Sequence, residues 1–197
     1  MPERHATTAR LIAAGLRLFA VDGVAATPIV KIEEAAGLAP GSGAFYKHFR
    51  SKAELLDAAV ADATSTSTAG ADFFTALDGL DLRDQARFIA RGTWMVFDAH
   101  HDLFLVMVRE VEHRPPRYTH DPNGWPGDGP AFVASWLESK VKAGQLVVSN
   151  PRATAVVLLD ALTSYWLQRH TESDKPYGVD DQQFVDAWVD LIAGLAP

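Results

Sequence analysis

Residues 27–56 read TPIVKIEEAAGLAPGSGAFYKHFRSKAELL and carry the start and stop signals of three consecutive helices. Thr27 and Pro28 favour a helix start, because threonine can cap the first free N–H groups and proline has no N–H to lose there. The first helix is expected to end near Gly37, since glycine readily adopts the left-handed conformation that stops a helix. After a turn rich in proline, glycine and serine, a second short helix is predicted over about residues 42–48.

The second of these helices combines aromatic and basic side chains. Phe45 and Phe49 are four residues apart, so both can anchor the helix in a core. Tyr46 and Lys47 can then face outward, toward phosphate. A capping box at residues 51–54 starts the third helix. This plan predicts a DNA-binding helix-turn-helix, although two core-packed helices that bind no DNA would use the same residues.

Almost every other segment also has a helical pattern, because apolar residues recur three or four positions apart. The sequence therefore predicts an all-α protein. Residues 63–70 are small and polar and are the expected boundary between the two domains. We expect a helix-turn-helix DNA-binding domain over residues 1–62 and a helical ligand-binding and dimerisation domain over residues 63–197. A long loop is expected over residues 114–129, where prolines and glycines interrupt the helical pattern.

Charge is distributed unevenly along a chain whose net charge is −7. Residues 1–56 hold seven basic and five acidic side chains, so the acidic excess lies in the remainder. A basic head permits phosphate binding despite the acidic total. The 197 residues contain no cysteine, which excludes disulfides and thiolate metal sites. With neither a secretion signal nor a membrane-length apolar run visible, we expect a cytoplasmic protein.

Residues 6–60 resemble the TetR family of transcriptional regulators. The resemblance rests on an ordered set of short matches: Arg10-Leu11-Ile12, Leu18-Phe19-Ala20, Gly23, Thr27, Ile32, Ala36-Gly37-Leu38, Phe45-Tyr46-Lys47-His48-Phe49, Ser51-Lys52 and Glu54-Leu55-Leu56. It implies an all-helical homodimer of about nine or ten helices, with a three-helix DNA-binding head. It also implies a double-stranded DNA operator and repression as the common mode of action.

The resemblance assigns DNA contacts to two groups of residues. Those expected at the DNA backbone are Thr27, Tyr46, Lys47, His48 and Lys52. Those expected at the bases are Pro40, Ser42, Gly43 and Ala44. The turn over residues 39–44 is two residues longer than the commonest turn of the family, so the start of the recognition helix stays open. Because the base-facing residues are small, DNA shape and half-site spacing are expected to supply much of the specificity.

Two helices near residues 151–171 and 181–195 are apolar on more than one face. A second subunit can cover the second face, so we predict a four-helix homodimer interface. Its expected residues are Val157, Ala161, Tyr165, Phe184, Trp188 and Leu191. The alternative is that both helices are only part of the intrachain core.

Aromatic residues, methionine and histidines in the middle of the chain could line a pocket for a small apolar or aromatic effector. The candidate residues are Trp94, Phe97, His101, Phe104, Met107, Trp136, Trp166 and His170. Each of them also suits an ordinary core or helix-end position. No recognised metal-ligand spacing occurs, so neither a metal nor a cofactor is expected.

Several sequence signals of enzymes are missing. The chain has no cysteine nucleophile, no Gly-x-Ser-x-Gly elbow and no phosphate-binding glycine loop. We therefore predict a non-enzymatic repressor that an apolar ligand releases from its operator. The alternatives are a helical dimeric small-molecule-binding protein and a cofactor-free enzyme, each without DNA binding.

Overall fold

The computed structural model describes residues 2–65, 76–109 and 129–197. These residues form eight α-helices and two short 3-10 helices, which confirms the all-α prediction. Across these ranges, no helix is both long and apolar enough to cross a membrane. Most of the predicted boundary at residues 63–70 and of the predicted loop at 114–129 lies outside the described residues.

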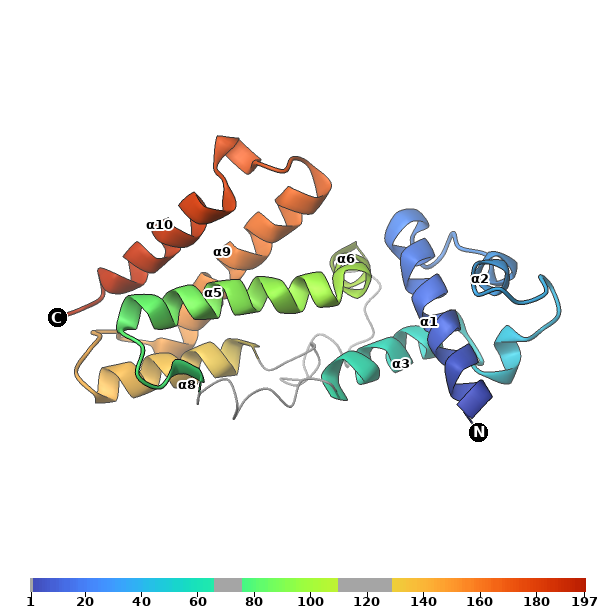
Figure 1. Cartoon of the computed structure of the whole chain (residues 1–197), viewed down its shortest axis with the longest axis horizontal. Coiled ribbons are helices and arrows are strands. Elements are labelled where there is room, and N and C mark those ends of the chain that lie inside the picture. The colour runs from blue at the N-terminus through green and yellow to red at the C-terminus, as the bar shows by residue number, and fades with distance from the viewer. Residues whose placement is uncertain (1, 66–75, 110–128) are drawn as a thin grey trace. The chain divides into compact units, whose positions relative to one another are not determined.

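The described helices group into two compact units. The N-terminal unit contains α1 (Pro2–Asp22), α2 (Ile29–Ala35), η1 (Phe45–Lys47), α3 (Lys52–Ser65) and α6 (His101–Arg109). The C-terminal unit contains α5 (Leu82–Ala99), α8 (Gly129–Lys142), α9 (Pro151–Thr171), η3 (Pro176–Gly178) and α10 (Asp181–Ala193). The helices are labelled in Figure 1. The N-terminal unit thus includes α6 in addition to helices of the predicted head, and a functional division at residue 62 stays a prediction.

The N-terminal unit is built around α1, which contacts α2, α3 and α6. Its fully buried side chains include Phe19, Ile32 and Leu55. Gly15 lets α1 and α3 approach closely, because a Cβ there would lie 3.0 Å from both terminal methyl groups of Leu55. Arg109 of α6 donates hydrogen bonds to main-chain carbonyls at the end of α1, which fixes one end of this unit.

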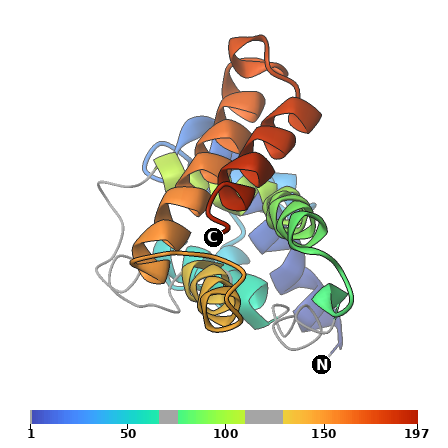
Figure 2. The same cartoon turned by 90° about the vertical axis from the view of Figure 1, so that its left-hand side faces the viewer.

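The C-terminal unit packs α8 on α9 and α10 on α5. Figure 2 shows α5 and α8 nearly end-on. Side-chain caps begin two of these helices: the side chain of Asn150 accepts a hydrogen bond from the Ala153 N–H at 3.1 Å, and Asp180 forms a capping box with Gln183. Local sequence signals therefore set the starts of α9 and α10.

Four tryptophans fix the packing inside the C-terminal unit. All four are buried, and each indole N–H donates to an acceptor of the same unit. The pairs are Trp94 with the Leu162 carbonyl at 3.0 Å, Trp136 with Gln85 Oε1 at 2.9 Å, Trp166 with Asp98 Oδ1 at 2.7 Å, and Trp188 with the Leu158 carbonyl at 2.9 Å. Buried polar atoms are costly without partners, so these bonds specify one arrangement of the helices.

Candidate nucleic-acid interface

The recognition segment is shorter than the sequence predicts. A helix was expected over residues 42–48, and the structure has only the 3-10 helix η1 over Phe45–Lys47. The reason lies in the preceding turn, where Gly41 and Gly43 have φ values of +72° and +70°. Left-handed residues cannot be part of a right-handed helix, so the helix starts after the second glycine.

The aromatic residues of this segment are placed as predicted. Phe45 is fully buried and Phe49 is 4% exposed, with ring centroids 5.7 Å apart. Tyr46 between them is 62% exposed, and Lys47 is also exposed. Two buried aromatic anchors therefore present a phenol hydroxyl and an ammonium group to solvent from a fixed backbone.

Glu33 of α2 organises the turn before this segment, and the sequence analysis missed it. Its side chain is buried, and its carboxylate accepts the Gly41 N–H at 2.7 Å and the Phe45 N–H at 2.9 Å. One signal could have identified it: Glu33 follows Ile29 and Ile32 at helical spacing, on the face that packs inward. A glutamate in such a stripe needs buried hydrogen-bond partners, and here the turn supplies them.

The four residues predicted to face the bases lie at the end of the turn, between α2 and η1. Pro40 and Ser42 are exposed, whereas Gly43 and Ala44 are partly buried. The Ser42 hydroxyl oxygen accepts the Ala44 N–H at 3.3 Å, so it is used within the turn. The structure thus groups the four residues predicted to face the bases, without testing that role.

Thr27 and Lys52 have internal partners. The Thr27 hydroxyl is buried and donates to the Gly23 carbonyl at 2.7 Å. The Lys52 ammonium group donates to the carbonyls of Val24, Ala25 and Thr27, the last two at 3.0 Å. Both side chains hold the connection between α1 and α2, and their predicted phosphate contacts stay predictions.

His48 connects the recognition segment to the first turns of α1. The Thr8 hydroxyl lies 2.9 Å from the Arg4 carbonyl oxygen and 2.8 Å from His48 Nδ1, within hydrogen-bond distance of both. Burial, followed by the positive charges of Arg4 and Lys47, lowers the pKa of His48 from its usual 6.5. This environment therefore favours the neutral form of His48 more than water does.

The predicted pocket residues are divided between the two units. His101, Phe104 and Met107 belong to the N-terminal unit, and Met107 is 1% exposed within its core. The other five candidates, in the C-terminal unit, are Trp94, Phe97, Trp136, Trp166 and His170. Their role as a ligand site is untested.

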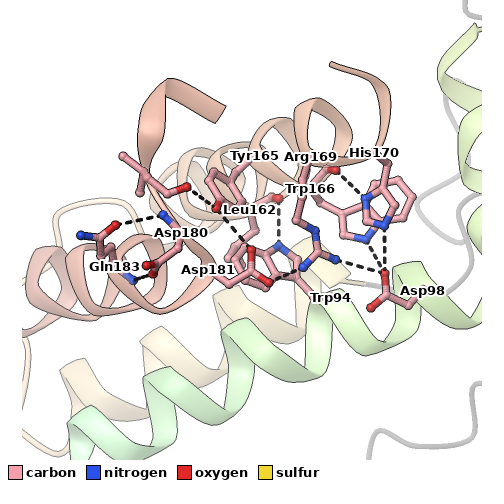
Figure 3. Close-up of polar contacts among 11 residues, drawn as sticks. Trp94, Asp98, Leu162, Tyr165, Trp166, Arg169, His170, Asp180, Asp181 and Gln183 are labelled. Atoms are coloured by element: carbon pink, nitrogen blue, oxygen red, sulfur yellow. Dashed lines mark hydrogen bonds and ion pairs between the residues drawn. The ribbon is translucent and has the colours of Figure 1, made fainter. Parts of the chain in front are cut away.

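A polar cluster in the C-terminal unit involves several of these candidates (Figure 3). Asp98 Oδ1 accepts the Trp166 N–H and lies 3.5 Å from Arg169 Nη2 and 3.6 Å from His170 Nε2. Arg169 also pairs with Asp181, and its guanidinium carbon lies 5.6 Å from the centroid of the Trp94 ring. These contacts connect α5, α9 and the start of α10.

The predicted dimer residues differ in exposure. Val157 of α9 is 68% exposed and Leu191 of α10 is 67% exposed, whereas Ala161 and Phe184 are partly buried. Two further candidates, Tyr165 and Trp188, are buried inside their own chain. The exposed pair is available to a second subunit, and the buried pair shapes the intrachain core.

Comparison with known proteins supports the interpretation of residues 27–56 as a DNA-binding helix-turn-helix. The family model for bacterial regulatory proteins of the tetR family matches residues 11–59. No curated protein matches the chain. A TetR-family transcriptional regulator from Mesorhizobium loti has a similar solved structure, with a TM-score of 0.71 at 18% identity, over 97% of this chain and 96% of that one.

Two further solved structures share the fold. One is a tetR-family regulatory protein from Rhodococcus RHA1, with a TM-score of 0.70 at 19% identity over 96% of each chain. The other is a fatty acid degradation regulator from Bacillus halodurans, with a TM-score of 0.69 at 16% identity over 94% of each chain. The family match covers the helix-turn-helix described above, from the middle of α1 into α3. Residues 11–59 thus match the family model of bacterial regulatory proteins of the tetR family, and the fold of the chain is similar to that of solved TetR-family regulators.

Proposed function

We propose that this protein is a TetR-family transcriptional repressor that binds its operator as a homodimer and leaves it when a small apolar or aromatic molecule binds. The exposure of Tyr46 and Lys47 on a segment anchored by buried Phe45 and Phe49 carries the DNA-binding part of this proposal. Access to operator DNA places the protein in the cytoplasm.

The proposed DNA contacts divide by chemistry. The proposed phosphate contacts come from the Tyr46 hydroxyl, the Lys47 ammonium group and His48. Contacts of this kind set the orientation of the protein on DNA without reading its sequence. Residues 40–44 face the base edges, where small side chains let the backbone approach closely. Thr27 and Lys52 support this interface by holding the start of α2 through their hydrogen bonds to carbonyls.

The proposed homodimer uses α9 and α10. Val156, Val157 and Leu191 leave 44%, 68% and 67% of their surface exposed, which is unusual for three aliphatic residues on two adjoining helices. Covering them with the same helices of a second copy removes apolar surface from water and gives a symmetric contact. Two recognition segments then meet two half-sites of one operator.

The proposed effector is apolar because the C-terminal unit is rich in aromatic side chains. The structural similarity to a regulator of fatty acid degradation fits this class of ligand. The effector releases DNA only if it binds the DNA-incompetent arrangement of the dimer more tightly than the competent one. It therefore acts on the operator through the distance between the two recognition segments.

Replacing one proposed phosphate contact tests the DNA interface. Lys47→Ala is expected to weaken binding to all duplexes, and to reduce the slope of log affinity against log salt by about 1, because one phosphate contact is lost. Fluorescence anisotropy across a salt series measures this slope. Lys142→Ala removes the same charge from an exposed position on α8 and is the matched control. Equal slopes for the wild type and both variants would contradict the proposed interface.

A further inference from the structure

The turn before the recognition segment cannot hold its own shape through helical hydrogen bonds. Gly41 and Gly43 are left-handed, so the regular i to i−4 pattern is interrupted between α2 and η1. The segment η1 itself is only three residues long. Its backbone position therefore depends on partners outside the segment.

Glu33 supplies those partners at three points. Its main-chain carbonyl accepts the Leu38 N–H at 2.9 Å, just after the end of α2. Its carboxylate then accepts the N–H groups of Gly41 and Phe45, through a different oxygen for each. A single buried residue thus holds the main chain at the end of α2, at Gly41 and at the first residue of η1, in addition to the local bond from the Ser42 N–H to the Ala39 carbonyl.

The two N–H groups held by the carboxylate bracket three of the residues that we place at the base edges. Ser42, Gly43 and Ala44 lie between Gly41 and Phe45. Their side chains offer little direct base readout, so the position of the backbone decides what they can contact. A shift in the Glu33 carboxylate would move all three together.

We propose that Glu33 is a positioning residue for DNA recognition, whose carboxylate holds residues 41–45 in the geometry that reads the operator. Glu33 is buried and does not itself touch DNA. This inference rests on the proposed placement of residues 42–44 at the bases. It predicts that Glu33 controls the preference for operator over other DNA more than it controls the affinity for DNA in general.

Glu33→Gln is the most direct test, because it keeps the side-chain shape and one acceptor but sets an NH₂ donor against one main-chain N–H. Its matched control is Glu34→Gln, which removes the same charge from the next, exposed position of α2. The probes are a duplex that the wild type selects from random sequences and a scrambled duplex of equal length. Glu33→Gln is expected to reduce the ratio of the two affinities by at least about tenfold, as for a mismatched operator.

Both charge-removing variants should bind the scrambled duplex at least as tightly as the wild type, because each lowers the negative charge near phosphate. Glu34→Gln should leave the affinity ratio within about twofold of the wild type. If the wild type is selective and Glu33→Gln has the same ratio of selected to scrambled affinity, the proposed role of Glu33 is overturned, while the proposed function stands. A wild type that selects no duplex would instead overturn the proposed function and this inference with it.

A second variant covers the case in which Glu33→Gln fails to fold. Gly41→Ala leaves Glu33 unchanged and finds open space for its methyl group, but disfavours the left-handed backbone that presents the N–H to the carboxylate. It should lower the affinity ratio in the same direction. A folded Gly41→Ala protein with a wild-type ratio would contradict the proposal.

Discussion

Glu33 in the N-terminal unit and Gln85 in the C-terminal unit are both buried polar residues that hold a turn. Glu33 accepts two main-chain N–H groups of its turn. The Gln85 side-chain amide donates to the carbonyls of Leu77 and Leu80, at 3.3 and 2.9 Å, and accepts the Trp136 N–H. Both side chains therefore hold the main chain of a turn, Glu33 by accepting hydrogen bonds from N–H groups and Gln85 by donating to carbonyls.

The two turns lead into helices of very different length. The turn at Gly79 leads directly into α5, a helix of 18 residues that packs on α9 and α10. The turn at Gly41 and Gly43 leads into a 3-10 helix of three residues. Gln85 therefore reinforces a position that helix packing already fixes. Glu33 holds a turn whose other supports are short local hydrogen bonds and the buried Phe45 ring that follows it. We infer that disturbing the turn at Gly79 affects stability, and that disturbing the turn at Gly41 and Gly43 affects DNA recognition.

Gln85→Leu should produce the largest loss of stability in this comparison. It leaves the Trp136 N–H without its acceptor and the Leu80 carbonyl without the Gln85 donor, whereas the Leu77 carbonyl still accepts the Leu80 N–H. Each buried unsatisfied group costs about 1–3 kcal/mol. A total loss of about 3 kcal/mol in the free energy of unfolding is expected by urea denaturation, with the operator preference retained. Gln145→Leu, at an exposed turn position, is the control and should be near neutral. A loss of operator preference in Gln85→Leu would remove the distinction between the two turns.

Gly43→Ala and Gly79→Ala are a closely matched pair of variants, with smaller expected losses of stability than Gln85→Leu. Gly43 and Gly79 have φ values of +70° and +82°, and a Cβ at either position meets no atom within 4 Å. Each substitution should therefore cost about 1–2 kcal/mol through backbone strain alone. Only Gly43→Ala should lower the ratio of operator to scrambled-duplex affinity, measured by fluorescence anisotropy. Equal ratios in the two variants would contradict the inference drawn from the two turns.

Tyr165→Phe should give the smallest effect, and it depends on pH. The Tyr165 hydroxyl donates to the Val179 carbonyl at 2.9 Å, so its removal should cost about 1 kcal/mol at pH 7. Burial and then the Asp181 charge raise the pKa of Tyr165 from 10.0 to about 12. Because the folded state favours the neutral phenol, this contribution is complete below pH 10 and is lost as the pH rises through 12.

Thermal melts of the wild type and Tyr165→Phe between pH 9 and about 12 would check this window. The wild type should lose its advantage over the variant as the pH rises. A constant difference between the two melting temperatures would show that the phenol does not titrate with folding.

Local sequence signals predicted much of the fold. The alternation of buried Phe45 and Phe49 with exposed Tyr46 was predicted because it depends only on neighbours in the sequence. The predicted length of the recognition helix was wrong. Two glycines near serine and proline indicate a turn but do not fix the residue at which the turn ends. The role of Glu33 depends on N–H groups eight and twelve residues away, and helical periodicity could show only that it faces inward.

Sequence-selective binding of duplex DNA is the property from which the other proposals follow. We would select duplexes from random sequences with the purified full-length protein and measure binding by fluorescence anisotropy across a salt series, with a scrambled duplex as reference. The selected duplex is expected to bind at least about a thousandfold more tightly than the scrambled one, and both affinities should fall steeply with salt. Equal affinity for the selected and scrambled duplexes at every salt concentration would contradict it.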